Sequence, residues 1–136
     1  MVQWLIGCGV ASVVFVGLDF LWLSTVGQSV YRPALKDLFA DRVHLAPAVA
    51  FYLVYVIGVM LLAVQPGVRA QSALTAATMA AVLGFVAYAT YDLTNMATLK
   101  VWPLKIAVLD IAWGTLLTAL AAGLACYAML RLGSQG

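Results

Sequence analysis

The sequence predicts an all-α fold, a four-helix transmembrane bundle with a short interfacial amphipathic helix between the first and second spans. Composition is the first reason: 65% of the 136 residues are hydrophobic and 9% are charged, against about 25% charged in a soluble domain. The second is four apolar stretches, each near or above the ~20 residues that cross the hydrocarbon core. The third is that Asp19, Asp92 and Asp110 lie inside those stretches.

Residues 1–136 form one predicted integral membrane domain. Its spans are expected at about 2–25, 47–65, 72–98 and 103–130. Pro47 suits the first turn of the second span, and Gln65-Pro66-Gly67 is expected to end it. Ser72 is a suitable N-cap for the third span.

The segment 33–45 between the first two spans is predicted to be the interfacial helix. Leu35, Leu38 and Phe39 share one helical face, while Lys36 and Asp37 fall elsewhere. Such a helix lies in the membrane interface with its cations reaching toward water. A solvated loop is the alternative.

The positive charges indicate the orientation of the chain. One membrane face carries Arg32, Lys36, Arg42, Lys100 and Lys105, and the other carries Arg69 and Arg131. Because short cytoplasmic loops are enriched in Lys and Arg, both termini are expected outside, in the periplasm of a Gram-negative bacterium.

The three aspartates are predicted to lie at one depth. Each is about 8–11 Å from the midpoint of its span, at about 1.5 Å per residue. Asp19 and Asp92 come late in spans that run toward the basic face, and Asp110 comes early in a span that runs away from it. Because a charge in a span is costly, about 2.5 kcal/mol or more, these side chains are expected to face a polar interior.

A polar stripe orients the third span. Tyr88, Asp92 and Asn95 follow i, i+4, i+7 spacing, with Tyr91 near the same stripe, so they share one helix face. That face is expected toward protein or water.

Small residues predict close helix packing away from the acids. The third and fourth spans carry them at helical spacing: Ala76, Ala80 and Gly84 on one, and Gly114, Thr118, Ala122 and Cys126 on the other. Small side chains let membrane helices approach closely.

Two aspartates are followed by tryptophan, Trp22 after Asp19 and Trp113 after Asp110. Since the two spans run in opposite directions, the indoles are expected on opposite sides of the aspartate layer. Tyr52 and Tyr55 of the second span are expected to face lipid, with the pocket as the alternative.

We therefore expect a polar pocket that binds a ligand or carries protons. Its candidate residues are Asp19, Asp92, Asn95, Asp110, Tyr88, Tyr91, Trp22, Trp113 and Lys105. Three ionised carboxylates in one pocket would repel, so protonation, a bound cation or a cationic ligand must compensate them.

Four interpretations stay open: interhelical hydrogen bonding alone, a small proton-coupled transporter, an intramembrane enzyme acting on a lipid or isoprenoid, and a divalent-cation site. The last lacks an Asp-x-x-x-Asp pair, so no metal is expected. No catalytic residue is assigned. No cofactor and no nucleic-acid partner are expected, and the lipid bilayer, a small-molecule or lipid ligand and a second copy in a homodimer are the expected partners.

The run from Tyr91 to Pro103 (YDLTNMATLKVWP) resembles a bacterial family of predicted membrane proteins, domain of unknown function 2177. The segments 18–22 (LDFLW) and 109–114 (LDIAWG) resemble its other polar stretches. The resemblance extends over essentially the whole chain and implies a multi-pass inner-membrane protein of about four helices. It implies no established activity.

Overall fold

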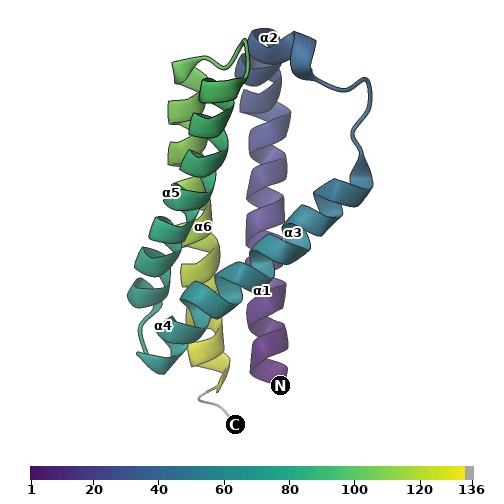
Figure 1. Ribbon diagram of the computed structural model, residues 1–136. Helices are drawn as coiled ribbons and strands as arrows, with labels where there is room; N and C mark the ends of the chain where they lie inside the picture. The colour runs from purple at the N-terminus through teal and green to yellow at the C-terminus, as the bar shows by residue number, and fades with distance from the viewer. Residues whose placement is uncertain (134–136) are drawn as a thin grey trace.

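The computed structural model describes residues 1–133, which are mostly helical with no β-strand among them. Four helical segments are long and apolar enough to cross a membrane: Val2–Leu38, Leu45–Arg69, Ala73–Thr98 and Leu104–Gly133. The predicted fold is thus confirmed. The N-terminus and the end of the last helix lie at one end of the bundle, and the basic connections lie at the other (Figure 1).

The first segment is longer than the sequence predicted. α1 (Val2–Trp22) continues through a π-helical stretch, η1 (Leu23–Tyr31), into α2 (Arg32–Leu35) and the short 3₁₀ helix η2 (Lys36–Leu38). The hydroxyls of Ser24, Thr25 and Ser29 donate to carbonyls four residues earlier, so the polar residues here are satisfied within the helix. As a result the helix does not end near residue 25.

The connector helix is shorter than predicted because the backbone becomes extended at Phe39. Leu35 is buried against Tyr31 and Ile106, whereas Leu38 and Phe39 are exposed. Residues 39–44 join this end to the second segment without a helix.

The second segment crosses the bundle obliquely (Figure 1) and comprises α3 (Leu45–Val59), π-helical η3 (Met60–Val64) and α4 (Gln65–Arg69). The expected stop at residues 65–67 is wrong. Pro66 is the second residue of α4, directly after the π-helical stretch η3, and the helix continues past it to Arg69. A Cβ on Gly67 would lie 2.5 Å from the Cβ of Ala76, so glycine lets α4 pack against the next helix.

α5 (Ala73–Thr98) and α6 (Leu104–Gly133) form the hairpin on which the other helices pack. Ser72 caps α5 as predicted, because its Oγ accepts a bond from the Thr75 N–H at 3.1 Å. A Cβ on Gly84 would lie 2.5 Å from the carbonyl oxygen of Gly114. The predicted small residues of both helices are all buried, so the close approach is confirmed.

Packing differs between the two ends. The main core lies toward the chain ends and consists of Ala11, Val56, Val59, Met60, Ala63, Val64, Ala76, Ala80, Ala122, Ala125, Cys126 and Met129. Toward the basic end, a smaller cluster of Tyr31, Leu35 and Ile106 closes the bundle. On each of α1, α5 and α6, the aspartate (Asp19, Asp92 or Asp110) lies between the part of the helix that joins the main core and its basic end.

Candidate functional site

Asp19 is held by donors from two other helices. It is 8% exposed, and its Oδ2 accepts a bond from the Tyr52 hydroxyl of α3 at 2.6 Å. Its Oδ1 accepts a longer bond from the indole N–H of Trp113, on α6, at 3.4 Å. The expectation that Tyr52 faces lipid is therefore wrong. α3 is apolar all around, so its sequence gave no polar face that would orient this tyrosine.

Asp110 accepts its bond from a residue of the π-helical stretch. The Tyr31 hydroxyl donates to Asp110 Oδ1 at 3.2 Å, and the indole N–H of Trp22 donates to the Tyr31 oxygen at 3.2 Å. The extension of the first helix beyond residue 25 is what brings Tyr31 to this carboxyl group.

The two indoles join these arrangements. Trp22 and Trp113 stack with ring centroids 4.4 Å apart and planes inclined by 4°. The expected placement on opposite sides of the acids is wrong. Helical side chains lean toward the N-terminus of their own helix, and α1 and α6 run in opposite directions, so these side chains converge.

Asp92 is the most deeply buried of the acids, with 0% exposure. Its Oδ1 accepts a bond from the Trp102 indole at 3.1 Å. Its Oδ2 has no hydrogen-bond partner among the described residues. The side chain of Asp110, on α6, interacts with that of Asp92 across the hairpin.

A cavity of about 460 Å³ lies between α1, α3, α5 and α6. It is lined by Asp19, Leu23, Phe51, Tyr55, Ala87, Tyr88, Tyr91 and Asp110. Tyr91, Leu23 and Phe51 are also largely exposed, so the cavity opens on the side of the bundle. Asp92 does not line it.

The remaining candidate residues are placed differently. Asn95 is half-buried and interacts with the Tyr91 side chain. Lys105 lines a separate surface pocket with Ser29 and Pro33, away from the cavity of Asp19. The structure thus brings Tyr88 and Tyr91 to the acids but not Lys105.

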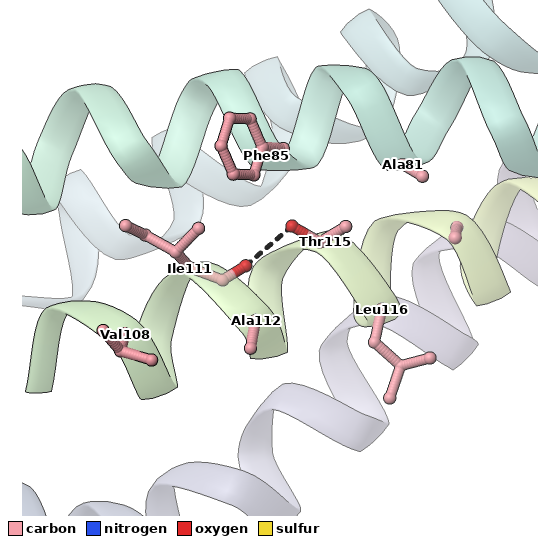
Figure 2. Close-up of a pocket in the computed structure, with 8 residues that line it drawn as sticks. Ala81, Phe85, Val108, Ile111, Ala112, Thr115 and Leu116 are labelled. Atoms are coloured by element: carbon pink, nitrogen blue, oxygen red, sulfur yellow. Dashed lines mark hydrogen bonds between the residues drawn. The ribbon is translucent and has the colours of Figure 1, made fainter. Parts of the chain in front are cut away.

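A larger hollow of about 690 Å³ lies elsewhere, on the outer face of α5 and α6 (Figure 2). Its lining is apolar except for Thr115, whose hydroxyl donates to the Ile111 carbonyl at 2.7 Å. With its one polar group already bonded, this groove has no group to orient a polar ligand.

Two residues of the site were missed from the sequence, Tyr31 and Trp102. Both are aromatic donors near the basic end, and no spacing along a single helix links either of them to the acid that it contacts. Within the described residues, no group of three or more His, Cys, Asp or Glu side chains is arranged to hold a metal ion.

The fold and the buried acids define a small polytopic membrane protein with carboxyl groups inside its helix bundle. The chain belongs to the family described as predicted membrane protein, domain of unknown function 2177, whose family model matches residues 4–127. The resemblance found in the sequence is thereby confirmed. No curated protein and no solved structure matches the chain.

Proposed function

We propose that the cavity at Asp19 and Asp110 binds a cationic, partly apolar small molecule and exchanges it for a proton, as in a small proton-coupled transporter. The observation that carries this proposal is the neutral character of every donor at the acids. Phenol hydroxyls and indole N–H groups reach them, and no described lysine, arginine or histidine donates to them.

Uncompensated acids favour a cation. A carboxylate buried without a positive partner is costly in an apolar medium. A proton or a cationic ligand removes this cost, and one can replace the other. Competition between the two at the same oxygens is the basis of exchange.

The walls of the cavity suit such a ligand. Phe51, Tyr55, Tyr88 and Tyr91 present aromatic rings around the acids, and ring faces attract cations by about 0.5–2 kcal/mol. The volume of about 460 Å³ lies in the range of small-molecule sites, about 300–1,000 Å³. The lateral opening lets an apolar cation enter from the bilayer.

The orientation follows from the charges. The end that carries Arg32, Lys36 and Lys100 faces the cytoplasm of a bacterial inner membrane by the positive-inside rule, which leaves both termini in the periplasm. A homodimer is part of the proposal, because a second copy against the open side would enclose the cavity.

The probe for binding is tetraphenylphosphonium, an apolar cation that carries no proton. Isothermal titration calorimetry in detergent is expected to show binding that Asp19→Asn and Asp110→Asn each weaken by at least about tenfold, about 1.4 kcal/mol. Asp37→Asn makes the same chemical change on the exposed connector and is expected to bind normally. Equal binding by all four proteins would refute the site.

Exchange is tested in proteoliposomes. A tetraphenylphosphonium gradient is expected to drive proton movement in the opposite direction, followed with an internal pH dye, and Asp110→Asn is expected to abolish it. Binding without proton movement would leave a binding protein and contradict transport.

An intramembrane enzyme acting on a lipid or isoprenoid is the second candidate. The lateral opening favours it, because acids that face a lipid-accessible cavity can transfer protons to a chain in the bilayer. It predicts altered lipids in a deletion strain, measured by mass spectrometry, with no cation-driven proton movement.

A further inference from the structure

We infer that Asp92 and Asp110 share one proton, and that a cation binding at Asp19 and Asp110 releases it. This inference rests on the proposed function for its second half only. It assigns distinct roles to the acids: Asp19 contacts the cation only, and the other two form the proton store.

The geometry of Asp92 is the first step. The side chain is completely buried, and one carboxyl oxygen has no donor among the described residues. An ionised carboxylate in such a place leaves an acceptor unsatisfied at a cost of about 1–3 kcal/mol, and more for a charged group. A proton on the pair converts this deficit into a hydrogen bond.

The contact with Asp110 is the second step. The two side chains interact across the α5–α6 hairpin, yet both carboxyl groups are acceptors when ionised. The contact is therefore a hydrogen bond only if one of them carries a proton. Adjacent carboxyl groups without a cation between them retain one proton for this reason.

Asp19 differs because it already has two donors, Tyr52 and Trp113. The Tyr52 bond is short, at 2.6 Å. Both oxygens of Asp19 therefore have a donor from another helix, and Asp19 lines the cavity as a second acid beside Asp110.

The other described groups facing the pair include no cation. They come from the first, second and third helical segments and from the connection before α6, and the set of titratable or donor side chains is Asp19, Tyr31, Tyr55, Tyr88, Tyr91 and Trp102. None of them is a lysine, arginine or histidine, so no positive side chain of the described residues takes the place of the shared proton.

Exchange needs water as its only other reactant. A cation that enters the cavity lies against Asp19 and Asp110, and its charge takes the place of the shared proton. The O–H bond of the pair breaks, and the proton passes from Asp110 to a water molecule in the open cavity, which carries it away as hydronium. One positive charge enters and one leaves, so the net charge of the site is unchanged.

Infrared spectroscopy of the purified protein without any ligand tests the pair. At neutral pH the wild type is expected to show the C=O band of a protonated carboxyl group. Asp92→Asn and Asp110→Asn are each expected to lose it, because the new amide N–H donates to the remaining carboxylate in place of the proton. Asp19→Asn and Asp37→Asn are expected to keep it.

Absence of the band from the wild type, or its persistence in either pair variant, would overturn the shared proton. Trp102→Phe keeps both carboxyl groups and is expected to keep the band while shifting its frequency, since the donor to Asp92 is lost. This variant tests the pair should an asparagine variant fail to fold.

The second half is tested by proton release. In weak buffer the wild type is expected to release about one proton per bound tetraphenylphosphonium, whereas Asp92→Asn binds the cation and releases none. Release by Asp92→Asn equal to that of the wild type would refute the pair as the source. If the wild type binds no cation, the proposed function fails while the infrared band still decides the shared proton.

Discussion

The end of the bundle near the chain termini and the region around the acids are built by opposite means. The terminal end packs helices through alanine and glycine, and its buried core contains one thiol, that of Cys126, and no acid. The acid region fills the space between its helices with aromatic rings and joins the helices by hydrogen bonds between side chains. The contrast indicates that tight packing at one end allows the other to keep a cavity and buried charge.

The largest expected effect is on stability, at the close contact between α5 and α6 where Gly84 meets Gly114. We call this contact the seam. Gly84→Leu places a side chain against the Gly114 carbonyl and Thr118, so we expect a loss of about 3 kcal/mol or more in the free energy of unfolding. Unfolding in mixed detergent and SDS micelles measures it. Gly17→Leu is the control, because a Cβ there meets nothing within 4 Å. Equal stability of both variants would contradict close packing.

Next in size is a hydrogen bond of the acid region. Tyr52→Phe removes the donor to Asp19, and we expect a loss of about 2 kcal/mol, the range for bonds to charged groups. The same unfolding titration measures it. Tyr127→Phe makes the matched change at an exposed tyrosine and is expected to be nearly neutral. A neutral Tyr52→Phe would mean that this bond contributes nothing.

A smaller effect is expected where the two regions meet. The hydroxyls of Tyr55 and Thr118 hydrogen-bond at 2.9 Å. Thr118→Val removes this partner of the Tyr55 hydroxyl, and we expect a loss of about 1 kcal/mol in the free energy of unfolding. In Thr115→Val only a bond within one helix is lost, so this control should change stability less. A larger loss of stability in Thr115→Val than in Thr118→Val would mean that the Tyr55–Thr118 hydrogen bond does not stabilise the protein.

The smallest effect is expected at Lys105. Because it lines a different pocket from Asp19, Lys105→Met is expected to leave tetraphenylphosphonium affinity unchanged in calorimetry. If Lys105→Met changed the affinity as much as Asp110→Asn does, the charge of Lys105 would have to act at the acids.

Much of the fold was predictable because length, hydropathy and helical rise determine it. The four membrane helices and the small-residue seam follow from these alone. Helix ends were harder: polar residues after Thr25 bond within their own helix, and Pro66 occupies a first helical turn. The spacing of apolar residues looks the same whether the helix continues through such residues or ends at them.

The acids were identified by their cost in an apolar span, but their partners were not. Tyr31 lay in a stretch expected to be a connector, and Trp102 in a tight connection between helices. Tyr52 lay on a helix apolar on every side. In each case the identity of the donor depends on helix rotation and on π-helical winding, which the residue pattern does not specify.

The indoles around these acids have a spectroscopic consequence. Trp22 and Trp113 stack beside Asp19, and Trp102 donates to Asp92. Indole emission responds to the electric field of nearby ions, so the native fluorescence of the protein reports whether these carboxyl groups gain or lose charge. Occupancy of the site can be followed by wavelength, with no label attached.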